Sequence, residues 1–184
     1  MVVKKAHIFA KGPTFTDITV PDDEIKVCVN HTCLHVQNPD IAVFNDIEPL
    51  QTVYKNLNKN CVIYIPVYPH YKMEPSQHYT KYEFLKELNI KTFNLSTKRI
   101  NDPSLIDIPI AISSVHTAIQ LVHKLYNSIE EIHTYGFCKG DGYHPLFQKI
   151  KIKKGIHPGR RDGDKLVNEK GNITKIVDKP IIIH

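Results

Sequence analysis

Short apolar runs recur along this chain, and each one ends abruptly at polar or glycine residues. The runs are rich in β-branched and aromatic residues, which is typical of buried strands. We predict strands at residues 6–10, 22–30, 40–44, 61–65, 91–95, 108–112 and 131–135. Helical spacing of apolar side chains separates some of these runs, and such alternation favours parallel pairing with right-handed crossovers. The sequence therefore predicts an α/β, Rossmann-like fold: a mainly parallel sheet flanked by helices.

The helices are predicted from the spacing of their apolar positions. Val115, Ala118, Ile119, Val122 and Leu125 form a stripe suited to packing on a sheet, with Ser113 or Ser114 as the N-cap. Similar stripes predict helices at 47–57 and 79–88, and a long loop without periodicity at 66–79. Beyond residue 135 the helical signal disappears, and we expect extended C-terminal strands or arms at 146–152 and 173–183.

Length and charge limit the kind of protein. A chain of 184 residues is long enough for one sizeable core, and we expect one domain, with a core at about 5–145 and a basic extension at about 146–184. No apolar stretch reaches the length of a membrane span, so we expect a cytoplasmic protein without one. The four cysteines lack paired spacing, which favours free buried thiols. A net charge of +5, concentrated late, favours anionic partners.

In an open parallel sheet, ligands bind beyond the carboxyl ends of the strands, where helix N-termini offer unpaired N–H groups. The residues that end the predicted strands are therefore the candidate nucleotide- or substrate-binding residues. They are Lys11, Gly12, Pro13, Thr14, Asn30, Asn45, Ser113, Ser114, Gly136, Lys139 and Tyr143. Each also fits a plain turn or helix cap. The chain lacks a Walker loop, a Gly-x-Gly-x-x-Gly fingerprint and a Gly-x-Ser-x-Gly elbow. A motor-type ATPase, a nicotinamide dehydrogenase and a Ser-His-Asp hydrolase therefore gain no support.

Acidic and histidine side chains supply candidates for catalysis. Asp141, flanked by glycines, and the strand-end or loop histidines His144 and His157 are the candidate acid–base residues. Asp46 and Glu48 form a loose pair that could hold Mg or Mn, although an acidic first helical turn explains them equally well. His7 and His133 lie within apolar runs, where a hydrogen-bonded core histidine is the usual finding.

The order of these motifs resembles the bacterial sialyltransferase-like superfamily, and is similar to the related domain of archaeal-type hydroxymethylpterin pyrophosphokinases. The resemblance spans residues 6–143 and is carried by IFAKGPT (8–14), CVN (28–30), VFND (43–46), ISS (112–114) and IHTYGFCKGD (132–141). It implies that residues 12–14 and Asn30 line a CMP-sugar, that Ser113 and Ser114 face sugar or phosphate, and that Tyr143 touches phosphate. It also implies a catalytic histidine downstream of residue 141. Lys11 and Thr14 depart from the small polar residue and the serine usual in that family.

Three functions follow as expectations. The first is a glycosyltransferase that moves a sugar from a nucleotide-sugar to the hydroxyl of a glycan or small-molecule acceptor. The second is a Mg-dependent pyrophosphokinase or phosphotransferase that uses Asp46, Glu48 and Asp141. The third is a non-catalytic module that binds nucleotides or nucleic acid through the basic region at 149–165, where nucleic acid is the less favoured partner.

Overall fold

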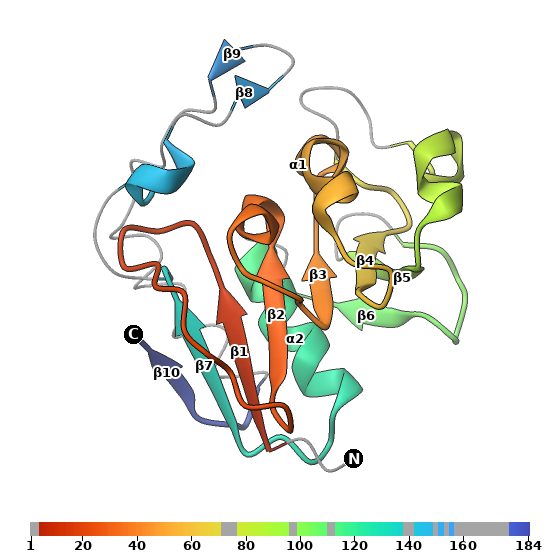
Figure 1. The fold of residues 1–184 in the computed structure, drawn as a ribbon. Coiled ribbons are helices and arrows are strands. Elements are labelled where there is room, and N and C mark those ends of the chain that lie inside the picture. Colours follow the sequence, from red (N-terminus) through yellow and green to blue (C-terminus); the bar gives the residue numbers. More distant parts are fainter. Residues whose placement is uncertain are drawn as a thin grey trace.

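One parallel sheet organises the structure. The computed structural model describes residues 4–70, 77–95, 99–109, 113–137, 142–148, 151–152, 155–156 and 177–184. Within these residues, eight strands pair in the order β10-β7-β1-β2-β3-β4-β5-β6 (Figure 1). Every neighbouring pair in this sheet is parallel. The α/β fold with a mainly parallel sheet, predicted from the sequence, is confirmed, although the helices that flank the sheet are few.

The strands are short and mostly coincide with the predicted apolar runs. Their bounds are β1 (Lys5–Phe9), β2 (Ile25–Val29), β3 (Ile41–Val43), β4 (Val62–Pro66), β5 (Ile90–Leu95), β6 (Ile106–Ile108), β7 (Glu131–Tyr135) and β10 (Ile181–Ile183). A separate antiparallel pair joins β8 (Lys151–Ile152) to β9 (Gly155–Ile156). The strand predicted at 108–112 instead begins at residue 106, and residues 110–112 lie outside the described part.

Among the residues that the structure describes there are two α-helices, α1 (Ile47–Val53) and α2 (Ser114–Leu125), together with short 3₁₀ turns. These turns are η1 (Asn30–Leu34), η2 (Tyr54–Asn56), η3 (Tyr79–Lys81), η4 (Glu83–Glu87) and η5 (Pro145–Phe147). The prediction of one helix over 79–88 is wrong, because Tyr82 adopts an extended backbone that separates η3 from η4. None of the described helices is long and apolar enough to cross a bilayer.

The two faces of the sheet bury different cores. Alternate residues of β1 point to opposite faces: Ala6 and Ile8 pack with the apolar stripe of α2, whereas Phe9 packs with residues of α1. Cys28, Cys33 and Cys61 are free, buried thiols, as predicted, and burial raises the pKa of Cys61 to about 12. The Cys61 thiol therefore stays protonated at neutral pH and fills space rather than reacts.

The strand order determines where segments that are distant in the chain meet. From β1 the sheet runs through β2 to β6 in one direction, while β7 and β10 lie on the other side of β1. The strand order therefore reverses at β1, which has a parallel neighbour on each side. In open α/β sheets, the carboxyl ends of strands at such a switch point form the usual ligand crevice. We therefore expect the predicted site residues to lie at the carboxyl ends of β1 and its neighbours.

Candidate functional site

Gly12 and Gly136 bring the turns after β1 and β7 into backbone contact. The N–H group of Gly12 donates to the carbonyl of Gly136 over 2.9 Å, and that of Ala10 donates to the carbonyl of Tyr135 over 2.8 Å. A Cβ atom on either glycine would lie less than 3.0 Å from a backbone oxygen of the opposite turn. Gly136 also has a φ of 74°, in the left-handed region that glycine favours. Both glycines are therefore required by the packing of the two turns.

Asn30 and Ser114 meet at the carboxyl edge of β2, although they lie 84 residues apart in the chain. The side-chain N–H of Asn30 donates to Ser114 Oγ over 3.3 Å. Asn30 has a φ of 55°, a left-handed conformation that asparagine tolerates better than most residues. Its Oδ1 atom is buried and accepts no hydrogen bond within the described part of the chain. An acceptor is thus present beside the first residue of α2.

Asn45 places a second amide at the end of the neighbouring strand β3. The residue is only 6% exposed, and its Oδ1 atom is also buried without a hydrogen-bond donor among the described residues. Its backbone carbonyl accepts from the N–H of His70 over 2.9 Å. A buried acceptor that is left unsatisfied costs about 1–3 kcal/mol. Two such oxygens on adjacent strands are suited to a ligand that carries N–H or O–H donors.

Asp46, the residue after Asn45, interacts electrostatically with Lys11 and His70. Burial raises the pKa of the Asp46 carboxyl, and the negative charge of Glu48 acts in the same direction. The interactions of Asp46 with His70 and Lys11 oppose the rise. The Nζ atom of Lys11 also lies 4.3 Å from the centre of the Tyr143 ring, a cation–π contact. His70 was missed by the sequence analysis because it follows no strand and belongs to a loop without periodicity.

Of the two histidines predicted as catalysts, only His144 lies within the described residues, and its ring packs against Phe15 and Phe147. The backbone N–H of His144 donates to the carbonyl of Lys11 over 2.8 Å, so the segment that carries Tyr143 and His144 covers the turn after β1. The Nδ1 atom of His144 accepts from the N–H of Leu146 over 3.3 Å, which leaves Nε2 as the ring atom for proton transfer. The other candidates for catalysis and binding at this segment, Lys139, Asp141 and His157, lie outside the described residues.

Ser113 and Thr14 are held in ways that the sequence did not indicate. Ser113 caps α2, as predicted, and its hydroxyl also lies 2.7 Å from Nδ1 of the fully buried His116. Thr14 donates its hydroxyl to the carbonyl of His184 over 2.9 Å, beside the end of β10. The turn after β1 is thereby joined to the end of β10. Pro13 lies in the same turn, partly buried.

The predicted metal pair gains no further ligands in the structure. Across the part of the chain that the structure describes, no group of three or more His, Cys, Asp or Glu side chains is arranged to hold a metal ion. Asp46 precedes α1 and Glu48 lies in its first turn, so the alternative reading as an acidic helix start also fits them.

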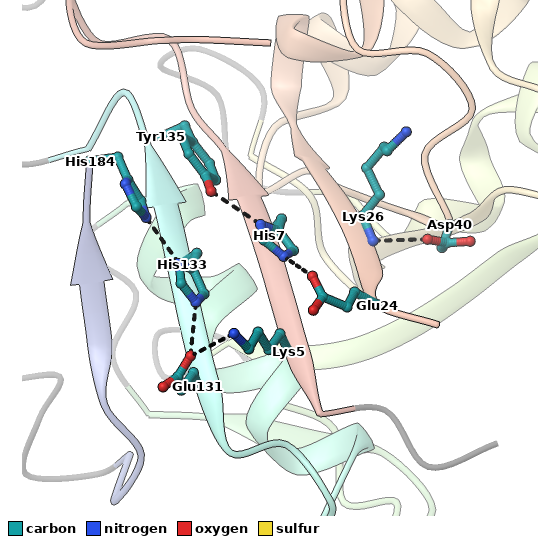
Figure 2. Close-up of polar contacts among 9 residues, drawn as sticks. All are labelled: Lys5, His7, Glu24, Lys26, Asp40, Glu131, His133, Tyr135 and His184. Carbon is teal, nitrogen blue, oxygen red and sulfur yellow. Dashed lines mark hydrogen bonds and ion pairs between the residues drawn. The ribbon is translucent and has the colours of Figure 1, made fainter. Parts of the chain in front are cut away.

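A second polar cluster was also missed by the sequence analysis. His7 on β1 and His133 on β7 are register partners, and each lies in its own chain of hydrogen bonds (Figure 2). His7 bonds to Tyr135 and Glu24, and His133 bonds to His184 and Glu131. The view that His7 is a hydrogen-bonded, buried histidine is confirmed, because it is 6% exposed and both of its ring nitrogens have partners. Only the pairing of β1 with β7 could have indicated the cluster.

Comparison with known proteins adds no relative. No protein-family model matches the sequence, no curated protein is similar to it, and no solved structure matches its fold. The functional inference therefore depends on the geometry of the carboxyl edge.

Proposed function

We propose that the carboxyl edge of β1, β2 and β3 binds a nucleotide-sugar and that the protein is a glycosyltransferase. The observation that carries the proposal is the pair of buried amide oxygens of Asn30 and Asn45 that have no hydrogen-bond donor among the described residues. Asp46, the residue after Asn45, interacts electrostatically with Lys11. A nucleotide offers the complementary groups, since its base and ribose carry N–H and O–H donors and its phosphate carries negative charge. The amide oxygens would accept from the base or ribose, and Lys11 would face the phosphate.

The α2 helix adds to the attraction for phosphate. It has 12 residues, and its N-terminus opens at the edge where Asn30 contacts Ser114. The N-terminal end of a helix carries a partial positive charge and favours anions. Lys11 lies over the Tyr143 ring and interacts electrostatically with Asp46. A bound phosphate would therefore compete with the Asp46 carboxylate for the positive charge of Lys11.

The transfer step needs a leaving group and a base. The acceptor hydroxyl attacks the anomeric carbon of the sugar, the bond from that carbon to the phosphate oxygen breaks, and the nucleotide departs with the bonding electrons. Lys11 would stabilise the charge that develops on the departing phosphate. Asp46 or Nε2 of His144 would take the hydroxyl proton. A carboxyl whose pKa is raised towards neutrality, as that of Asp46 is, serves this role better than an ordinary one.

Calorimetry with CMP, UDP, GDP and AMP, each with Mg²⁺ and with EDTA, tests the binding step. We expect one of these nucleotides to bind without metal, and Asn45→Ala and Asn30→Ala each to weaken that binding by about tenfold, the equivalent of one buried hydrogen bond. Asn127→Ala is the matched control, because Asn127 is exposed and follows the opposite end of α2. Absence of binding at millimolar nucleotide, or unchanged affinity in both variants, would contradict the proposal. Binding that requires Mg²⁺ would favour phosphoryl transfer instead.

A further inference from the structure

Strands β1, β7 and β10 carry polar rings on the face of the sheet opposite α2. The register places His7 beside His133 and Phe9 beside Tyr135 on β1 and β7. Strand β10 continues these rows, since Ile183 pairs with Thr134 and His184 follows it. The rings of Tyr135 and His184 are stacked, with centroids 4.5 Å apart and an interplanar angle of 9°. The row of Phe9, Tyr135 and His184 therefore crosses all three strands, whereas the row of His7 and His133 reaches Ile182 on β10. Figure 2 shows His7, His133, Tyr135 and His184 on the same face of the sheet.

His184, His133 and Glu131 form a chain of hydrogen bonds that ends on the Glu131 carboxylate. His133 Nδ1 lies 2.9 Å from His184 Nε2, and His133 Nε2 lies 3.1 Å from Glu131 Oε2. Glu131 also forms an ion pair with Lys5 at 3.3 Å. Because Glu131 accepts, His133 Nε2 carries a proton. When His133 is neutral, its Nδ1 is then an acceptor and the proton between the two rings comes from His184 Nε2.

The ring geometry identifies the His133–His184 contact as a hydrogen bond. The centroids are 5.2 Å apart and the planes differ by 15°. That separation is about as large as a 2.9 Å contact between two ring nitrogens permits, so the rings lie nearly edge to edge with one nitrogen pointing at the other. A metal ion between them would need about 2.0 Å to each nitrogen, and the gap is too short for that. The pair must hold a proton.

A second chain runs parallel to the first. The Tyr135 hydroxyl donates to His7 Nδ1 over 3.2 Å, and His7 Nε2 donates to Glu24. Burial lowers the pKa of His7, against the opposing effect of Glu24, so His7 is neutral at pH 7. The rings of His7 and His133 lie 5.0 Å apart at 17°. On β2, Lys26 is the register partner of His7. The charged groups around His133 are thus Glu131, Lys5, His7 and His184, with Glu24 and Lys26 beyond His7.

The number of protons on the pair decides whether it can stay bonded. With no extra proton, His184 donates and His133 accepts, and with one extra proton the two rings share it while Glu131 offsets the charge. With two extra protons both rings are donors, so that an N–H group faces an N–H group and two positive charges lie side by side. Lys5 and the neighbouring His7 add to that repulsion once His7 is itself protonated. The hydrogen bond is then lost.

We propose that His133 and His184 form a proton-controlled clasp that fastens strand β10 to the sheet. The clasp is closed while the pair holds at most one extra proton and opens on double protonation. His184 also holds the turn after β1, through its carbonyl and the Thr14 hydroxyl. Opening therefore removes one of the contacts that hold β10, and with it loosens the residue to which Thr14 is bonded. This inference does not depend on the proposed glycosyltransferase function.

Amide hydrogen exchange, followed by NMR from pH 7.5 to pH 5 and corrected for the intrinsic rate, tests the clasp. The probes are the two amides that face β7, that of Ile182, the register partner of His133, and that of His184, which donates to the Thr134 carbonyl over 3.0 Å. We expect their protection to fall by about tenfold or more on acidification, while that of β3 and β4 changes less. In His133→Gln, which keeps a polar side chain but cannot titrate, protection of β10 should no longer depend on pH. His78→Gln, outside the cluster, should behave like the parent chain.

Ring ¹⁵N spectra of the parent protein supply a readout that does not need a variant to fold. We expect His133 to carry its proton on Nε2 at pH 7.5, and the hydrogen bond between His133 Nδ1 and His184 Nε2 to be present at pH 7.5 and lost at pH 5. A hydrogen bond between the two rings that persists unchanged at pH 5 would overturn the proposal. So would protection of β10 that stays constant to pH 5 in the parent, or a pH dependence that survives in His133→Gln.

Discussion

Replacing Gly136 with alanine should destabilise the protein severely, because the site allows neither a Cβ atom nor a change of backbone. Gly136 has a φ of 74°, and alanine in the left-handed region costs about 1–2 kcal/mol. The new Cβ would also lie less than 3.0 Å from the carbonyl oxygen of Ala10. Relief of that clash separates β1 from β7 and weakens the hydrogen bonds of Ala10 and Gly12, which contribute about 1 kcal/mol each. The expected loss is about 3–4 kcal/mol.

Urea unfolding followed by circular dichroism measures this loss. With an m-value of about 2 kcal/mol/M, the midpoint should fall by roughly 1.5–2 M while m stays constant. Asn38→Ala is the matched control, because Asn38 has a φ of 48°, is exposed and already carries a Cβ atom. In Asn38→Ala, the free energy of unfolding falls only by the cost of placing alanine in the left-handed region. A Gly136→Ala protein that unfolds within about 0.5 kcal/mol of Asn38→Ala would refute the reasoning from backbone contact, since the clash is the only difference of this size.

Three further perturbations test the cores and the buried charges. Because burial holds the pKa of His7 below 6.5, the unfolded chain binds more protons below that pH, so the free energy of unfolding should fall as pH drops from 6.5. In His7→Gln, urea titrations at pH 7 and 5 should show less of this fall. Ser113→Ala removes the cap of α2 and should cost about 0.5–2 kcal/mol in the same assay. Ile119→Ala opens a cavity at a fully buried position of α2 and should cost about 2–5 kcal/mol, whereas a cost under 1 kcal/mol would mean that α2 is not packed as described.

Local patterns in the sequence predicted the elements better than their arrangement. The apolar run at 131–135 became β7 with those bounds, and the stripe between Ser113 and Tyr126 became α2. Both depend on side-chain spacing within a few residues. The 3₁₀ turn η1 was not predicted, because it depends on the Thr32 hydroxyl, which donates to the carbonyl of Phe9 on another strand. No pattern within residues 30–34 predicts the contact between Thr32 and Phe9.

The candidate site was predictable in part for the same reason. Ligand residues at strand ends follow from the general behaviour of parallel sheets, and Asn30 and Ser114 do meet there. Strand order, however, is a global property. The sequence could not show that Thr14 is directed towards β10, or that His7 and His133 are neighbours, because both facts follow from the placement of β7 and β10 beside β1.

The position of β1 inside the sheet has a consequence for folding during synthesis. Its contact with β7 joins residues 128 apart, as between His7 and Tyr135. At about 5–20 residues per second, a ribosome needs roughly ten seconds to make that intervening chain. During this interval β1 can pair with β2, but its other edge stays open to solvent or to a chaperone. Folding of this chain should therefore be slow and should complete only after β7 has emerged, since the contacts that close the sheet are far apart in sequence.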